Sequence, residues 1–370
     1  MINTKEFIEQ LILNDINFFT GVPDSLLSGF SESLHFDFKN KNHVISANEG
    51  SAAAIAMGHH LSTGKIPAIY MQNSGLGNFV NPYVSLMHKE IYNIPFLLIV
   101  GWRGNPEISD EPQHLFQGKI TIDLLELLEI PYLIIDGNTD ERLIFESMNI
   151  SLSQNKPFAL IVKKDTFSNK GRSFENDTNL LTREDALVSF LEIFDKNSVY
   201  ISTTGKLSRE LYKTRLDNEE ITNDFYTVGG MGHASAISLG IALNKEEKTI
   251  VCLDGDGSAL MHLGNIGTIG AMGLQNFYHV LFNNSSHESV GGQPNIYKDL
   301  KRKDLFYGLN YKNYVYVENK DEIKKINISE LKGPTLIEVK VQNSSDKNLI
   351  RPDKSPVENK KLFRSKLNKG

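Results

Sequence analysis

Two short polar segments carry the residue types that hold a metal ion. Gly255-Asp256-Gly257 and Asn283-Asn284 each end an apolar run, and 25 residues lie between Gly257 and Asn283. That length suits one helix crossing between two parallel strands. The crossover would set a carboxylate and a carboxamide side by side at the carboxyl ends of neighbouring strands, where a doubly wound sheet binds its ligand.

A carboxylate, an amide oxygen and a backbone carbonyl together form a hard oxygen site. Mg²⁺ suits such a site because it keeps several waters and takes further ligands from phosphate oxygens. The glycines beside Asp256 would let a phosphate approach the backbone closely. The two segments therefore predict a magnesium and phosphate site. The alternative is a tight turn followed by an Asn that caps a strand end.

A second candidate lies in the first half of the chain. The segment from Ala47 to Gly58 consists mostly of small residues, which predicts a helix that packs its backbone close to a neighbour. Glu49 falls near the start of this helix, where the macrodipole favours a carboxylate. From these residues alone, Glu49 is either a functional acid or a first-turn residue with a local capping role.

Two further segments precede the Gly-Asp-Gly strand. Ser202 to Lys206 leaves a predicted strand and offers hydroxyls and amides to a diphosphate, although Ser or Thr at such a place is usually an N-cap. Thr227 to Ala234 is a glycine-rich turn, in which Met231 could be ordinary loop packing.

These segments need a scaffold, and alternating apolar runs and helical patterns predict an α/β fold of two doubly wound, mainly parallel sheets. The polar stretch 163–179 is interpreted as a linker between domains 1–170 and 180–370. The expected strands are Ile16–Phe19, His43–Ser46, Ala68–Met71, Pro95–Val100, Tyr132–Ile135, Phe158–Val162, Ser198–Ser202, Thr249–Leu253, Phe277–Phe282, Asn313–Val317 and Thr335–Val341.

Composition excludes several classes of protein. A net charge of −6 favours neither nucleic acid nor an anionic membrane surface as a partner, and no apolar run is long enough to span a bilayer. A single cysteine, Cys252, leaves no intrachain disulfide, and we expect a buried residue and a cytoplasmic protein. The tail from Arg351 to Gly370 carries seven Lys or Arg against two acidic residues. It predicts a solvated end, with a lid that supplies a cation as the alternative.

Taken together, these segments cover nearly the whole chain and resemble the thiamine diphosphate-dependent 2-oxo acid decarboxylases, whose signature is Gly-Asp-Gly, a spacer of this length and Asn-Asn. The resemblance implies thiamine diphosphate and Mg²⁺ as cofactors, with one domain for the pyrimidine and one for the diphosphate. The middle domain of pyruvate decarboxylase and acetolactate synthase would be missing, because the chain is too short. Glu49 would hydrogen-bond the aminopyrimidine and activate it.

The same resemblance implies the ligand set. Asp256, the second asparagine Asn284 and the carbonyl of Ser286 would hold Mg²⁺. Ser285 stands where a small residue such as Gly is expected, which leaves the Ser286 contact open. The Gly229 carbonyl would accept a hydrogen bond from the cofactor's amino group, and Met231 would separate its two rings. The other cofactor-binding residues would be Thr204, Gly205, Gly255, Gly257 and Ser258.

Within the family, the sequence resembles the phosphonopyruvate decarboxylases in residues 21–27, 101–104 with 110–114, 231–235 and 283–294. Sulfopyruvate decarboxylases are the alternative, and the run from His287 to Pro294 favours the phosphonate. The implied reaction converts 3-phosphonopyruvate to phosphonoacetaldehyde and carbon dioxide, in phosphonate biosynthesis. The implied assembly is a homodimer or homotetramer with active sites at subunit interfaces.

Catalytic and substrate-binding residues are expected in the same motifs. Proton transfers would use Asp24, His114 and His287, although Asp24 could be a turn residue that bonds its own backbone. Phosphonate and carboxylate groups need cations and directed donors. The substrate-binding candidates are Ser25, Arg103 and Gln293, although Arg103 could instead pair with Glu107 or Asp110.

Two other functions are alternatives to the decarboxylase. A nicotinamide-dependent dehydrogenase would need Gly-x-Gly-x-x-Gly opening a helix, and neither Gly229-Gly230-Met231-Gly232 nor Gly264-Asn265-Ile266-Gly267 fits it. A cofactor-binding regulator without turnover is the non-catalytic alternative. The joint presence of Glu49, Asp256 and Asn284 argues against it.

Overall fold

A computed structural model of the chain describes residues 1–38, 42–172, 174, 176–221, 224–346 and 349–368. The chain divides into two compact units, Met1–Ser173 and Phe174–Gly370. Each unit contains one six-stranded sheet in which all strand pairs are parallel, and the described residues form no third sheet. The predicted fold class, two doubly wound domains without a middle domain, is confirmed.

The first unit has the strand order β2-β1-β3-β4-β6-β5. Chain direction across the sheet reverses between β1 and β3, so this is the switch point where doubly wound sheets bind ligands. The strands are β1 (Phe19–Gly21), β2 (His43–Ile45), β3 (Ala68–Gln72), β4 (Leu97–Gly101), β5 (Tyr132–Ile135) and β6 (Phe158–Val162). The strand expected at residues 16–19 is wrong in position. Ile16 and Phe18 are apolar because they are buried, but parallel pairing begins only at Phe19.

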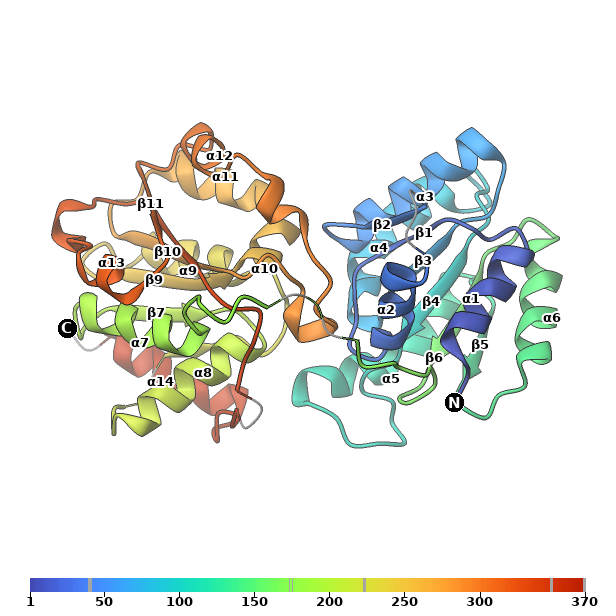
Figure 1. Cartoon of the computed structure of the whole chain (residues 1–370), viewed down its shortest axis with the longest axis horizontal. Helices are drawn as coiled ribbons and strands as arrows, with labels where there is room; N and C mark the ends of the chain where they lie inside the picture. The colour runs from blue at the N-terminus through green and yellow to red at the C-terminus, as the bar shows by residue number, and fades with distance from the viewer. Residues whose placement is uncertain (39–41, 173, 175, 222–223, 347–348, 369–370) are drawn as a thin grey trace. The chain divides into compact units, whose positions relative to one another are not determined.

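Helices cover both faces of this sheet (Figure 1). One face packs against α1 (Thr4–Leu13), α2 (Ser28–Phe36) and α6 (Glu141–Leu152). The other packs against α3 (Glu49–Thr63), α4 (Leu76–Pro82) and α5 (Pro112–Leu127). The four inner strands β1, β3, β4 and β6 are almost fully buried as a result, which explains their continuous apolar runs, whereas the edge strands β2 and β5 are only partly buried.

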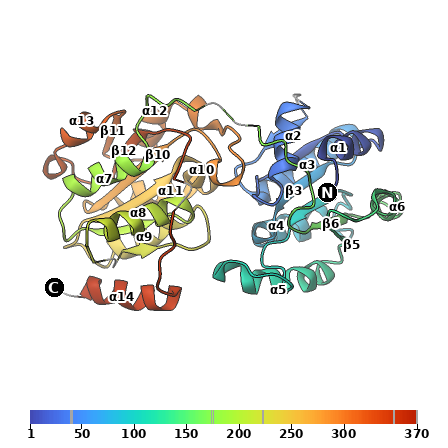
Figure 2. The same cartoon turned by 60° about the horizontal axis from the view of Figure 1, so that its bottom comes forward.

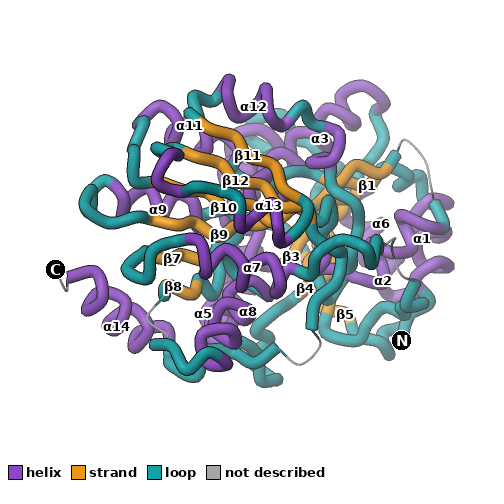
Figure 3. Tube along the Cα trace, turned by 60° about the vertical axis from the view of Figure 1, so that its left-hand side comes forward, coloured by secondary structure: helices purple, strands orange, loops and turns teal. Residues whose placement is uncertain are grey.

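The second unit has the order β11-β12-β10-β9-β7-β8, and its strands lie side by side in this order in Figure 3. Its switch point lies between β7 and β9. The strands are β7 (Val199–Ser202), β8 (Phe225–Tyr226), β9 (Ile250–Gly255), β10 (Phe277–Asn283), β11 (Asn313–Val317) and β12 (Thr335–Lys340). The two-residue edge strand β8 was not predicted.

Helices α7 (Arg183–Ile193), α8 (Lys206–Asp217) and α13 (Lys320–Lys324) share one core with this sheet. The opposite core contains residues of α9 (Ala234–Ala242), α10 (Asp256–Met261), α11 (Leu263–Met272), α12 (Arg302–Gly308) and α14 (Pro356–Asn368). The prediction of a solvated basic tail holds only in part, because most of residues 351–368 are exposed whereas Asn359 and Phe363 are buried. Phe363 of α14 packs on Phe225, and Asn359 donates to the Asp224 carbonyl at 2.9 Å. Figure 2 shows α14 as the red helix at the lower edge of the second unit.

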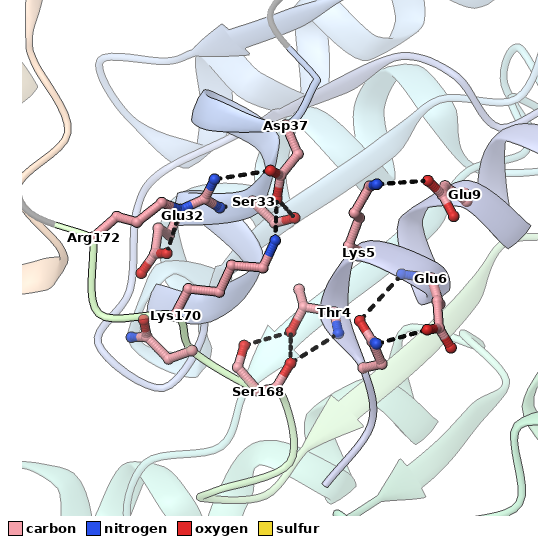
Figure 4. A network of polar contacts seen from close by, with 12 residues as sticks. Thr4, Lys5, Glu6, Glu9, Glu32, Ser33, Asp37, Ser168, Lys170 and Arg172 are labelled. Atoms are coloured by element: carbon pink, nitrogen blue, oxygen red, sulfur yellow. Dashed lines mark hydrogen bonds and ion pairs between the residues drawn. The ribbon is translucent and has the colours of Figure 1, made fainter.

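The start of the segment interpreted as a linker is held on the first unit (Figure 4). Ser168 accepts from the Thr4 backbone at 3.1 Å. The Arg172 guanidinium bonds Asp37 through two nitrogens, each at 2.8 Å, and Glu32 at 2.8 Å. Up to Arg172, the chain is thus fixed to α1 and α2.

Candidate active site

Polar residues that follow three strands, β7, β9 and β10, surround a cavity of about 90 Å³ at the switch point of the second unit. Thr203 and Thr204 follow β7, and Asp256 follows β9. Nine residues predicted for this site line the cavity: Thr204, Met231, Gly255, Asp256, Gly257, Ser258, Asn284, Ser286 and His287. Gly205 and Gly229 are not among the lining residues.

Asp256 is the first residue of α10 and is 3% exposed. Its Oδ1 accepts from the Gly257 amide at 2.8 Å, and its Oδ2 accepts from Asn295 Nδ2 at 3.2 Å. Burial raises the pKa of this carboxyl to about 6, against the opposing effect of these hydrogen bonds. A divalent cation would remove the cost of burying the charge, so the environment fits a metal ligand.

The two asparagines at the end of β10 have different surroundings. Asn283 is fully buried, its Nδ2 donates to Glu338 at 2.7 Å, and its Oδ1 accepts from the Ser285 amide at 3.0 Å. Both ends of its amide group are thus used inside the fold. Asn284 instead lines the cavity. Its Oδ1 accepts from the Ser286 amide at 3.0 Å, a local contact that leaves this oxygen a second lone pair.

A glycine-rich turn, residues 229–232, is locked against the same cavity. Gly232 has φ +86°, and a Cβ there would lie 2.5 Å from the His262 ring, so no other residue fits. Its amide donates to Ser258 Oγ at 3.1 Å, and Ser258 Oγ lies 3.0 Å from Thr203 Oγ1. Gly205, with φ +98°, makes the turn from β7 into α8. These contacts bring three separate predicted segments together.

The loop after Asn284 places Glu288 in a cluster of charged side chains with Arg183 of α7 and Lys206 of α8. Glu288 accepts from Arg183 and from Lys206, each at 2.7 Å, and all three line the cavity. Burial alone would raise the pKa of Glu288, but the two cations lower it to about 2. His287 is neutral at neutral pH because burial lowers its pKa to about 4. Gln293 is fully buried.

In the first unit, Glu49 is the first residue of α3 and is 5% exposed. It does not cap its own helix, since Asn48 does so by accepting from the Ser51 amide at 2.9 Å. The Glu49 carboxylate instead accepts from Asn78 Nδ2 of α4 at 2.9 Å. A Cβ on Gly75 would lie 2.5 Å from this carboxylate. The absence of a Cβ at Gly75 therefore makes space for the Glu49 carboxylate, and a capping role does not explain its position.

The other predicted residues of the first unit gather at its switch point. Asp24 follows β1, is fully buried, and accepts from Gln72 Nε2 at 2.6 Å and from the Leu26 amide at 3.0 Å. Burial raises its pKa, and Gln72 and Arg103 oppose that rise. Arg103 bonds Asp110 through two nitrogens and Ser25 Oγ at 3.1 Å. Asp110 is thus one of the two partners anticipated for Arg103.

His114 lies in the first turn of α5, close to the turn that contains Arg103. A Cβ on Gly104 would lie 1.9 Å from the His114 carbonyl, so this glycine allows the close packing. Burial and Arg103 lower the pKa of His114. Its Nδ1 is buried and has no hydrogen-bond partner among the described residues. An unsatisfied buried nitrogen at a strand-end cluster fits a role in binding or proton transfer.

Three charged residues that line the cavity, and one amide that contacts Asp256, were not predicted as site residues: Arg183, Lys206, Glu288 and Asn295. Lys206, Glu288 and Asn295 lie inside or beside predicted motifs, so their polar side chains could have identified them as candidate site residues. Arg183 lies 105 residues from its partner Glu288, and no local pattern connects the two.

The chain matches two descriptions of known families. Residues 3–127 match the thiamine pyrophosphate enzyme N-terminal TPP binding domain, and residues 203–339 match the C-terminal TPP binding domain. The donor set agrees with these matches. Asp256, Asn284 and the backbone beside them present the kind of oxygen atoms that Mg²⁺ prefers, and Ser286 Oγ is buried without a partner among the described residues.

Curated relatives cover the full length. The chain is 32% identical to phosphonopyruvate decarboxylase of Streptomyces viridochromogenes, over 99% of this chain and 95% of the relative. Phosphonopyruvate decarboxylase of Streptomyces hygroscopicus is 31% identical over 98% and 94%. Sulfopyruvate decarboxylase of Methanosarcina acetivorans is 28% identical over 69% of each chain. The chain therefore belongs to the thiamine pyrophosphate enzymes, in the group that contains the phosphonopyruvate and sulfopyruvate decarboxylases.

None of the helices in the described ranges combines the length and the apolar character needed to cross a membrane.

Proposed function

We propose that this chain decarboxylates 3-phosphonopyruvate to phosphonoacetaldehyde and carbon dioxide, with thiamine diphosphate and Mg²⁺, as a step of phosphonate biosynthesis. The observation that carries the proposal is the cavity at the second switch point, lined by Asp256, Asn284 and Ser286 together. The two full-length relatives named phosphonopyruvate decarboxylase support the choice of substrate.

In this proposal, Asp256, Asn284 and the Ser286 carbonyl hold Mg²⁺ and, through it, the diphosphate. The backbone around Gly255, Gly257 and Ser258, with Thr204 and Gly205, would hold the phosphate oxygens, and Gly229 and Met231 would hold the ring system. When bound, thiamine diphosphate supplies the electron sink for the electrons left as carbon dioxide departs. Glu49 would hydrogen-bond the aminopyrimidine and so activate it, in an environment nearly closed to water.

Proton transfers at the substrate are assigned to two histidines and one acid. His287 is neutral because of its lowered pKa, so its ring offers one nitrogen that accepts a hydrogen bond and one that donates. His114 has a buried Nδ1 without a partner among the described residues and a pKa lowered by burial and Arg103. Asp24 has a raised pKa, which suits a carboxyl that exchanges a proton during turnover.

Substrate binding is assigned to Arg103, Ser25 and Gln293. Arg103 already pairs with Asp110, which orients the guanidinium rather than leaving it free. Its side chain is 21% exposed, so part of the group remains accessible to an anion. Directed, charge-assisted hydrogen bonds of this kind suit a phosphonate.

A homodimer or homotetramer with active sites at subunit interfaces is the proposed assembly. Helix α5 supports it with exposed apolar side chains, including Phe116 at 72% and Leu127 at 79% exposure. Phe116→Asp should shift the protein toward monomer in light scattering and lower its activity. A dimer that persists unchanged in this variant would contradict the use of α5.

The test of the proposed function is carbon dioxide release by purified protein, with and without thiamine diphosphate and Mg²⁺. We expect release from phosphonopyruvate only when both cofactors are present, and its loss in Glu49→Gln. Turnover by Glu49→Gln at the wild-type rate would contradict the mechanism. Sulfopyruvate is the second candidate substrate, favoured by the sulfopyruvate decarboxylase relatives.

A further inference from the structure

The loop that carries two proposed metal ligands is a hairpin closed on itself. Ser286 and Pro294 form an antiparallel bridge, the Asn295 amide donates to the Ser285 carbonyl at 3.0 Å, and the His287 amide donates to the Gln293 carbonyl at 2.8 Å. These bonds set the shape of the hairpin, residues 284–294. They do not fix its tip to the rest of the unit.

Glu288 supplies a connection between the tip and two helices. Its Oε2 accepts from Arg183 Nη1 of α7, and its Oε1 accepts from Lys206 Nζ of α8, both at 2.7 Å. The Glu288 side chain is 11% exposed, so water screens these contacts weakly. Charge-assisted hydrogen bonds of this length are among the stronger polar contacts in proteins.

Arg183 is itself a rigid anchor. Its Nε and Nη2 bond both carboxylate oxygens of Glu210, at 2.6 and 2.7 Å, and the two side chains are 9% and 2% exposed. A bidentate pair fixes the plane of the guanidinium, which leaves Nη1 directed at Glu288. The tip is therefore held on a buried ion pair that exists independently of the loop.

Charge in this cluster is balanced. Arg183 and Lys206 carry two positive charges, and Glu210 and Glu288 carry two negative charges. Removing the charge of Glu288 would leave one excess positive charge beside a cavity built for a diphosphate. If Glu288 served only to neutralise Lys206, it would weaken the binding of an anion in the cavity. Removing its charge would then strengthen that binding.

We propose that Glu288 is a positioning residue that tethers the hairpin 284–294 to α7 and α8, and so keeps Asn284 and Ser286 in place to bind Mg²⁺. This inference rests on the proposed function for the identity of the ligands. The tether itself is a property of the protein without cofactor. Glu288 acts through the loop and touches neither the substrate nor the reacting atoms.

The test compares wild type with Glu288→Gln, which keeps the shape and removes the charge. Lys206→Gln is the second variant, because Lys206 is 35% exposed and its loss leaves the Arg183 contact intact. Glu192→Gln is the matched control, an exposed Glu of α7 paired with Lys324. Thiamine diphosphate binding is titrated by calorimetry over a series of Mg²⁺ concentrations. Backbone hydrogen exchange of residues 284–294 is measured in the intact protein without cofactor.

We expect Glu288→Gln to raise the Mg²⁺ concentration needed for half-maximal cofactor binding about tenfold, the scale of one charged hydrogen bond. Exchange in the hairpin should accelerate by a similar factor. Lys206→Gln should give a smaller change in the same direction, and Glu192→Gln should give none. Tighter cofactor binding with unchanged Mg²⁺ dependence, or unchanged exchange in the hairpin, would overturn the tether.

The exchange measurement separates the two proposals. Failure of the wild type to bind thiamine diphosphate at any Mg²⁺ concentration would overturn the proposed function. The exchange rates of the four proteins would still decide whether Glu288 holds the hairpin.

Discussion

Gly75 gives the most direct way to move Glu49 without removing it. A Cβ at Gly75 would lie 2.5 Å from Glu49 Cγ and 2.5 Å from Glu49 Oε1. Carbon atoms in contact sit about 3.5–4.0 Å apart, so Gly75→Ala must displace the carboxylate by about 1 Å. Gly75 has φ −74° and ψ −14°, a conformation that Ala adopts freely.

The displaced atoms are the end of a flexible side chain, so the cost to folding is small. An off-rotamer side chain costs about 0.5–1.5 kcal/mol. A misplacement of about 1 Å at a catalytic group can cost about 100-fold in rate, equivalent to about 2.7 kcal/mol. We therefore expect Gly75→Ala to fold nearly as well as wild type and to lose about 100-fold in kcat/KM.

The assay is carbon dioxide release under saturating Mg²⁺ and thiamine diphosphate, with the unfolding midpoint measured alongside. Gly77→Ala is the matched control, because a Cβ there meets no atom within 4 Å. In α4, that change should stabilise the helix by about 0.5–1 kcal/mol and leave the rate unchanged. A Gly75→Ala variant within twofold of the wild-type rate would refute the role of Glu49 and its placement.

Three further predictions use other parts of the fold. Asn283→Ala should lower the free energy of unfolding by about 1–3 kcal/mol in urea titration, because it breaks the 2.7 Å bond to buried Glu338. Asp256→Asn should instead remove Mg²⁺-dependent cofactor binding in calorimetry, with little change in stability. The reverse pattern would contradict the ligand assignment. Burial lowers the pKa of His43 from 6.5 to about 4, so the folded protein binds fewer protons than the unfolded chain in this window. Stability should be fully present above pH 6.5 and fall toward pH 4 by at most about 2–3 kcal/mol, and an unchanged slope in His43→Gln would contradict this source. Phe363→Ala should cost about 3 kcal/mol in thermal unfolding and spare the decarboxylation rate; an unchanged melting temperature would show that α14 does not stabilise the second unit.

The sequence predicted those features that depend on local patterns. Strand ends followed by Gly-Asp-Gly or Asn-Asn could be read as ligand sites, because parallel strands bring their carboxyl ends to one edge of a sheet. The same patterns located eleven of the twelve strands, although the first was expected to begin three residues before β1 does. The missing strand, β8, has two residues, too few for any period to show.

Features that depend on tertiary contact could not be read in this way. The basic composition of the tail suggested solvation, yet Phe363 and Asn359 bury themselves against Phe225 and Asp224. Those contacts hold α14 on the second unit, while its basic residues Lys360, Lys361 and Arg364 stay exposed as the composition suggested. The Arg183–Glu288 pair joins segments far apart in the chain, so only the folded structure reveals it.

The measurement that tests the central claim most directly is a comparison of kcat/KM for phosphonopyruvate, sulfopyruvate and pyruvate, each with thiamine diphosphate and Mg²⁺. We predict the highest value for phosphonopyruvate, with phosphonoacetaldehyde and carbon dioxide formed in equal amounts. A preference for sulfopyruvate would contradict the substrate assignment and leave the cofactor site intact. No release of carbon dioxide from any of the three would contradict the account as a whole.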